Sequence, residues 1–101
     1  MNDKTNTKYE VRTSNKFNKQ LKKIISQGKK LEKLMYVVVQ LANGIKLESK
    51  YKDHALYDNK YYNNCRECHI EPDWLLIYKH LNNEIILYLI STSSHKDLFN
   101  M

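Results

Sequence analysis

The chain has 101 residues and a mass of 12.1 kDa, which suits a single domain with one two-layer core. Its hydrophobic fraction of 42%, with 11% aromatic residues, argues against intrinsic disorder. The longest apolar runs are six residues, whereas a membrane helix needs about 20. We therefore expect one folded domain over residues 1–101, flexible at residues 1–8, with no membrane partner. Because no apolar export segment follows residue 8, a cytoplasmic location is expected.

The basic side chains are concentrated in the first third of the chain. The formal net charge is +6: residues 1–33 carry ten basic and three acidic side chains, a net of +7, and residues 34–101 carry seven and eight, a net of −1. Four lysines fall on one predicted helix: Lys16, Lys19, Lys22 and Lys23. Such a surface suits a polyanion or an acidic partner protein. A lysine-rich helix face that is merely solvated is the alternative.

The first half of the chain predicts a short strand and two helices. Residues 9–12 alternate in polarity, and Thr13 and Ser14 then offer N-cap hydroxyls. Apolar residues next recur at helical spacing: Phe17, Leu21, Ile24 and Ile25. Gly28 is well placed to end this helix. A second helix is expected over residues 29–41, and the short link makes the pair an antiparallel helical hairpin.

The second half of the chain predicts strands. The expected elements are an ordered loop at 47–64, strands at 65–70, 74–78 and 85–90 with a turn at 81–84, a hydroxyl-rich loop at 91–94, and one helical turn at 97–101. A strand, two helices and then a meander of strands predict an α+β fold. In this fold the helices pack on one face of a small twisted antiparallel sheet.

A C-x-x-C-H motif at residues 65–69 matches the pattern of c-type haem attachment. Haem attachment needs an exported chain, and no second Cys or His pair completes a zinc site. A strand would also place Cys65 and Cys68 on opposite faces of the sheet. We therefore expect two reduced cysteines, with no metal and no cofactor.

Three histidines and one carboxylate are candidates for acid–base chemistry. They are His54 in the expected loop, His69 and Asp73 on either side of one strand junction, and His95 after the hydroxyl-rich loop. Groups that titrate near neutral pH suit RNA cleavage, because the 2′-hydroxyl needs a base and the departing 5′-oxygen needs an acid. The residues alone leave the alternative open that these are unconnected surface side chains.

Three blocks of sequence carry a resemblance to a known family. They are YKDHAL at 51–56, CRECHIEPDWLLIY at 65–78 and SHKDLF at 94–99. Taken in this order, the blocks closely resemble the YafQ branch of the RelE/ParE toxin superfamily, and the likeness extends from Tyr9 to Phe99. The resemblance implies the toxin of a type II toxin–antitoxin pair, a ribosome-dependent endoribonuclease that cuts mRNA in the ribosomal A site and so inhibits translation.

The resemblance also implies roles for individual residues. His54, His69, Asp73 and His95 would form the acid–base cluster, with His95 as the general acid and Asp73 or His69 as the base. Phe99 would orient the nucleotide by stacking. Trp74 would support the site from the sheet, and the lysine-rich helices would contact ribosomal RNA.

The resemblance further implies partners. These are a cognate antitoxin with a ribbon-helix-helix dimer, the ribosome with its mRNA, and operator DNA only through the antitoxin.

Two positions depart from the family pattern, and the first matters for the chemistry: Ser91 replaces an arginine and Ser93 replaces a glycine. Ser91 stands where the family usually has an arginine that braces the scissile phosphate. Arg66 is a candidate replacement, although a structural arginine on the strand before His69 is the alternative. The departure leaves a second function open. This is an attenuated or non-catalytic binding module, either a degenerate toxin or a gyrase inhibitor of the ParE kind.

Overall fold

The computed structural model describes residues 8–57, 60, 62–81 and 85–94. The elements in chain order are β1 (Glu10–Thr13), α1 (Asn15–Ser26), α2 (Leu31–Ala42), the short 3-10 helix η2 (Ser49–Tyr51), β2 (His54–Ala55), β3 (Arg66–Glu71), β4 (Trp74–Leu81) and β5 (Ile86–Ser94). The expectations for residues 1–8, apart from Lys8, and for a helical turn at 97–101 lie outside the described residues.

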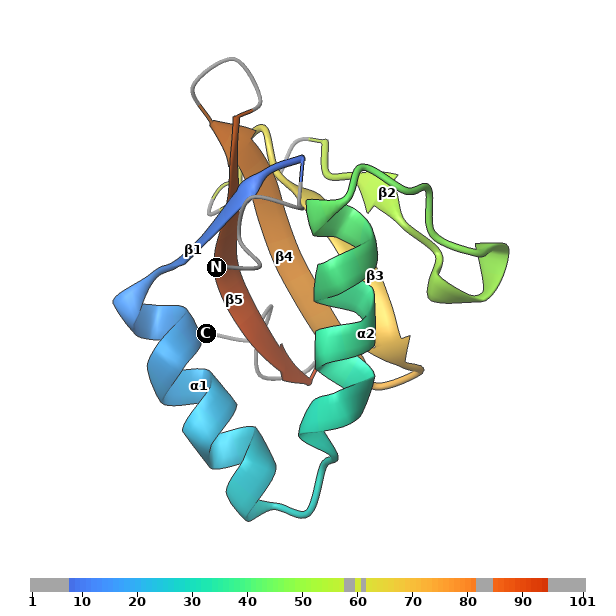
Figure 1. Ribbon diagram of the computed structural model, residues 1–101. Coiled ribbons are helices and arrows are strands. Elements are labelled where there is room, and N and C mark those ends of the chain that lie inside the picture. The colour runs from blue at the N-terminus through green and yellow to red at the C-terminus, as the bar shows by residue number, and fades with distance from the viewer. Residues whose placement is uncertain (1–7, 58–59, 61, 82–84, 95–101) are drawn as a thin grey trace, which may run out of the picture.

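The five strands form one open sheet in the order β1-β5-β4-β3-β2 (Figure 1). Neighbouring strands are antiparallel except for β1 and β5, which are parallel. A parallel pair needs a long connection, and the elements between β1 and β5 provide one. The predicted α+β fold is confirmed, with this one parallel pair making the sheet mixed.

Helix α1 begins where the sequence predicts. The Ser14 Oγ accepts a hydrogen bond from the Phe17 N–H at 2.9 Å, which caps the helix, and donates its own proton to the Ile90 carbonyl at 2.7 Å. Gln20 Oε1 accepts from the Thr92 N–H at 2.9 Å. The side chains of Ser14 and Gln20 thus bond backbone groups of β5 past the residues that pair with β1. The start of α1 therefore covers this part of the strand edge.

The two helices diverge from a short link. Gly28 has φ +93°, a left-handed conformation that ends α1 as predicted. Helix α1 then packs against β5, whereas α2 packs against β3 (Figure 1). Both predicted helices are therefore present, but the predicted antiparallel hairpin is wrong, because the helices diverge and pack on different strands of the sheet.

Alternation along the strands gives the sheet two different faces. The main apolar core lies between the helices and one face, and its strand residues include Cys68, Ile70 and Leu76. A smaller cluster on the opposite face includes Leu75 and Ile77. Successive residues of β3 and β4 therefore point to different sides, as strand geometry requires.

Two of the predicted loops are wrong in part. Residues 91–94 were expected to form a loop, but they complete β5, where they pair with the first residues of β4. Pairing with a buried neighbouring strand outweighs the low strand preference of serine. The expected loop at 47–64 contains η2 and the short strand β2. Strand β4 also extends beyond residue 78 to Leu81.

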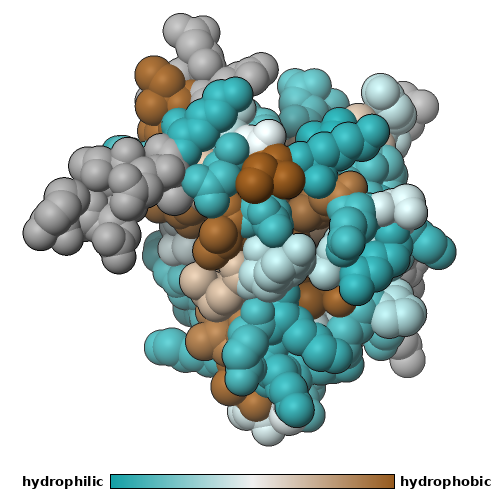
Figure 2. Space-filling view, turned by 45° about the vertical axis from the view of Figure 1, so that its right-hand side comes forward, coloured by the Kyte–Doolittle hydropathy of each residue, from teal (hydrophilic) through white to brown (hydrophobic). Residues whose placement is uncertain are grey.

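The outer side of α2 leaves a row of large apolar side chains exposed. Leu31, Met35, Tyr36 and Val39 are 43–48% exposed. Figure 2 shows apolar side chains among hydrophilic ones on this side of the molecule. Among the described residues, none of the helices is long and apolar enough to cross a membrane.

Candidate active site

A buried carboxylate lies on the sheet face opposite the helices, on the strand next to the β2 edge. Glu67 of β3 is only 5% exposed, and its Oε1 lies 3.3 Å from the His54 Nε2 and 3.8 Å from the His69 Nε2. His54 faces Glu67 across the β2–β3 pair, and His69 follows Glu67 by two residues on the same face. The structure thus joins two of the predicted histidines through a carboxylate. We refer to His54, Glu67 and His69 as the imidazole–carboxylate cluster.

Backbone carbonyls fix the orientation of both imidazole rings. The His54 Nδ1 lies 2.6 Å from the Lys52 carbonyl oxygen, and the His69 Nδ1 lies 3.3 Å from the Pro72 carbonyl oxygen. Because a carbonyl only accepts, each Nδ1 must be the donor. The His54 Nε2 then faces the Glu67 carboxylate. A hydrogen bond between them requires one proton, carried either by the nitrogen or by the carboxylate oxygen. The arrangement can therefore hold and exchange a proton at its centre.

Asp73 and Trp74 follow at the turn between β3 and β4. Asp73 is exposed in this turn, next to the Pro72 carbonyl that holds His69. Trp74 is 1% exposed and belongs to the core on the helix side. Its Nε1–H donates to the Thr92 Oγ1 at 2.9 Å, so it ties β4 to β5 below the candidate site.

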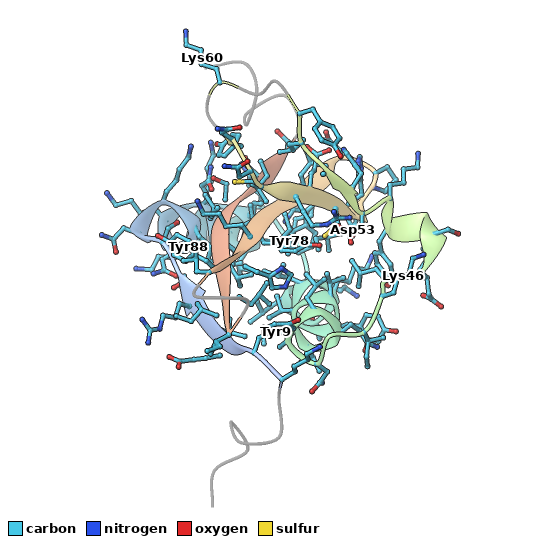
Figure 3. The ribbon with its side chains drawn as sticks, turned by 90° about the horizontal axis from the view of Figure 1, so that it is seen from above. Tyr9, Lys46, Asp53, Lys60, Tyr78 and Tyr88 are labelled. Carbon is cyan, nitrogen blue, oxygen red and sulfur yellow. The ribbon has the colours of Figure 1, made fainter. Side chains whose placement is uncertain are left out.

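Arg66 is not brought to the imidazole–carboxylate cluster. It pairs across the sheet with Tyr78 on the helix side, and its Nε lies 3.3 Å from the Asp53 Oδ1. The Tyr78 hydroxyl donates to the same oxygen at 2.6 Å, and Figure 3 shows Tyr78 and Asp53 together. Burial, and then the hydrogen bond to Asp53, raise the pKa of Tyr78. This geometry favours the interpretation of Arg66 as a structural arginine.

Two serines lie on the same face as the cluster, on the far side of β4. Ile77 pairs with Glu67 on one side and Ser91 on the other, and Leu75 similarly separates His69 from Ser93. Ser91 is fully buried and Ser93 is 6% exposed. His95 and Phe99, the other two predicted site residues, lie outside the described residues.

The predicted lysine surface on α1 is exposed, and one of its members is held in place. Lys16, Lys19, Lys22 and Lys23 all have exposed side chains. The Lys16 Nζ donates to the Tyr62 hydroxyl at 2.7 Å and lies 5.0 Å from the centre of the Tyr62 ring. Lys16 therefore extends from the helix toward the loop before β3.

Both cysteines are buried and free, as expected. Cys65 belongs to the cluster on the face with Glu67, and Cys68 belongs to the helix-side core. Burial raises the pKa of both thiols. Within the described parts of the chain, no group of three or more His, Cys, Asp or Glu side chains is arranged to hold a metal ion.

Sequence reasoning missed Glu67. The C-x-x-C-H pattern drew attention to its flanking cysteines, and the carboxylate between them was left without a role. The available signal was strand alternation: Glu67 and His69 are two residues apart in a predicted strand and must share a face. Tyr62 was also missed, and its place in a loop gave no comparable signal.

The fold and the imidazole–carboxylate cluster together define a small α+β protein with two imidazoles and a buried carboxylate on one face of an open sheet. Residues 9–100 match the family model described as "Bacterial toxin of type II toxin-antitoxin system, YafQ". The chain belongs to this family of bacterial toxins.

Relatives of known sequence and structure agree with this assignment. The chain is 34% identical over 91 residues to the mRNA interferase toxin YafQ of Escherichia coli (strain B / BL21-DE3), covering 89% of this chain and 95% of the relative. A metal-bound toxin from Helicobacter pylori superposes with a TM-score of 0.82 at 41% identity, covering 90% and 99% of the two chains. A chain of the E. coli DinJ–YafQ complex superposes with a TM-score of 0.79 at 35% identity, covering 90% and 98%.

Proposed function

We propose that this toxin is an mRNA endoribonuclease whose chemistry depends on the imidazole–carboxylate cluster. The observation that carries the proposal is the Glu67 carboxylate within 3.3–3.8 Å of two imidazole nitrogens on the face opposite the helices. Proton-exchanging groups of this kind suit a reaction that needs a base and an acid. The name of the E. coli relative, an mRNA interferase, supports the same substrate class.

The proposed reaction is an attack by the 2′-hydroxyl on the adjacent phosphate. A base, His69 or Asp73, takes the hydroxyl proton as the new phosphorus–oxygen bond forms. An acid, His95, gives a proton to the 5′-oxygen as its bond to phosphorus breaks, which leaves a 2′,3′-cyclic phosphate and a 5′-hydroxyl. Glu67 orients the two rings and stabilises positive charge on them. Phe99 stacks on the nucleotide.

The setting we propose is the ribosomal A site, within the cytoplasm. The lysine-rich surface of α1 would contact ribosomal RNA, since phosphate contacts supply affinity that does not depend on sequence. Outside the ribosome we propose inhibition by a cognate antitoxin of the ribbon-helix-helix type, through which alone the toxin reaches operator DNA. The structure of a DinJ–YafQ complex from E. coli supports the existence of such a partner.

The second candidate is a toxin-fold binding module with little or no catalysis. Ser91 motivates it, because a buried serine cannot give a phosphate the two parallel donors of an arginine. Growth arrest without RNA cleavage, which a gyrase inhibitor would cause, would identify such a binding module.

The test is to map the 5′ ends of cellular mRNA after induction of the wild type, Glu67→Gln and Glu48→Gln. The last variant removes an exposed carboxylate outside the cluster. We expect new 5′-hydroxyl ends at codon positions for the wild type and Glu48→Gln, and a rate roughly 10²–10⁴-fold lower for Glu67→Gln. Co-expression of the neighbouring antitoxin gene should abolish the new ends. Growth arrest by the wild type without new ends would favour the binding module.

A further inference from the structure

Lys16 occupies an unfavourable position for a lysine. It is the second residue of α1, where the positive end of the helix dipole opposes a cation, and the first turn of α1 contains no acidic residue. The remaining lysines of the predicted surface lie further along the helix, away from this end. A charge kept where local electrostatics disfavours it points to a role beyond helix stability.

Tyr62 holds the Lys16 ammonium group in a defined place. The Lys16 Nζ donates to the Tyr62 hydroxyl at 2.7 Å and lies 5.0 Å from the ring centre, within the range of a cation–π contact. Tyr62 is only 4% exposed, so its ring is itself fixed. Of the three N–H donors on this ammonium, the described chain uses one. The other two donors can bind an anion.

Ser91 connects this lysine to the face that carries the candidate site. The Ser91 Oγ donates to the same Tyr62 hydroxyl at 3.3 Å. Ser91 stands in one cross-strand row with Ile77 and Glu67. Since adjacent strands lie about 4.8 Å apart, the backbones of Ser91 and Glu67 are separated by about 10 Å. The lysine therefore flanks the site from the β5 side, while the imidazole–carboxylate cluster flanks it from the β3 side.

We propose that Lys16, held by Tyr62 above Ser91, binds a backbone phosphate of the RNA strand that crosses this face. The proposal rests on the endoribonuclease function proposed above. A strand that presents one ribose to the histidines carries its neighbouring phosphates across β4 toward β5, where this cation stands. Between the two flanks, Leu75 and Ile77 are fully buried and so bring no charge to the surface that the RNA strand would cross. The positive charge on the β5 side of the site therefore comes from Lys16 of α1.

The test measures binding as well as cleavage. A fluorescent 2′-O-methyl RNA octamer, which lacks the attacking hydroxyl, is titrated with the wild type and with Lys16→Ala, Lys16→Arg, Tyr62→Phe and Lys46→Ala at several salt concentrations. Lys46 is an exposed lysine on the side of the molecule away from α1, which makes Lys46→Ala a control matched in charge (Figure 3). Circular dichroism melts verify that each variant is folded.

We expect Lys16→Ala to weaken binding roughly tenfold and to reduce the slope of log K against log [salt] by about 0.7 relative to Lys46→Ala. Lys16→Arg should retain most of the affinity, and Tyr62→Phe should give an intermediate loss. In cleavage assays the Lys16→Ala change should appear in KM more than in kcat. Equal binding by Lys16→Ala and Lys46→Ala, or no binding of the octamer by the wild type, would overturn the proposal. Binding that behaves as expected without any mRNA cleavage would refute the endoribonuclease function and leave the phosphate site supported.

Discussion

The two faces of the sheet differ in chemistry although they alternate along the same strands. On β3, Cys68 and Ile70 enter the apolar core beneath the helices, whereas Glu67 and His69 point to the opposite side. The helix side contains most of the buried apolar side chains, and the opposite side contains the buried carboxylate and two buried serines. A shift of one residue therefore separates the groups that stabilise this fold from those that can exchange protons.

The largest expected effect is a loss of stability on the helix side. Leu76 is fully buried in the main core, so Leu76→Ala should lower the free energy of unfolding by about 2–5 kcal/mol in urea titrations. Glu67→Gln keeps the volume of the side chain and should change stability much less than Leu76→Ala while it reduces cleavage. Leu31→Ala, at a site that is 43% exposed, is the control for the leucine change. Similar losses for Leu76→Ala and Glu67→Gln would erase the distinction between the faces.

A medium effect is expected where a buried polar contact joins β4 and β5 on the helix side. The Thr92 Oγ1 accepts from the Trp74 Nε1 and donates to the Leu75 carbonyl, both at 2.9 Å. Thr92→Val keeps the shape but leaves the indole N–H buried without an acceptor, which should cost about 1–3 kcal/mol of stability.

A double-mutant cycle with Trp74→Phe checks this assignment. If the hydrogen bond carries the effect, Thr92→Val should be less harmful in the Trp74→Phe background, because no indole donor is then left unpaired. Strictly additive losses would contradict it.

The smallest effect concerns the second carboxylate of β3. A bulge between His69 and Glu71 turns Glu71 to the helix side, where both oxygens lie 2.7 Å from lysine ammonium groups, those of Lys29 and Lys33. These hydrogen bonds lower the pKa of Glu71 below its ordinary value of 4.5. Because the folded-state pKa is the lower one, the stabilisation is complete above the ordinary value and is lost as the pH falls through the folded-state pKa.

Glu71→Gln should therefore reduce stability at pH 7 by about 0–1 kcal/mol, since solvent reaches both lysine side chains, which are 38% and 53% exposed. Urea titrations of both proteins at descending pH should converge in acid, and added salt should reduce the difference at pH 7. A gap that widens in acid would show that the lysine contacts do not govern the titration of Glu71.

Much of the fold could be predicted from the sequence, because the spacing of apolar residues indicates which side chains are buried. The helical spacing from Phe17 to Ile24 and the glycine at position 28 predicted α1 correctly. The strand at residues 91–94 was missed because serine carries little strand preference of its own, and pairing with β4 supplies the stability there. Strand pairing of this kind depends on tertiary neighbours that no local pattern encodes.

The candidate site was predictable to a smaller degree. Residue type and resemblance identified His54 and His69, and the structure brings these two together through Glu67. The contact between Lys16 and Tyr62 joins residues 46 positions apart, one of them in an irregular loop. Contacts of this kind follow from the assembled fold, so sequence patterns alone could not provide them.

The pairing of β1 with β5 has a consequence for the order of assembly during translation. The Ser14 hydroxyl bonds the Ile90 carbonyl across 76 positions of the chain, and β1 has no sheet partner other than β5 within the described residues. Contacts this distant in sequence are slow to form, because closing the long intervening chain costs entropy. A nascent chain that ends before β5 lacks Ser91 and Ser93, which lie beside the candidate site. It also lacks the strand against which α1 packs. During synthesis, the two sides of the candidate site are therefore brought together only after β5 has been made.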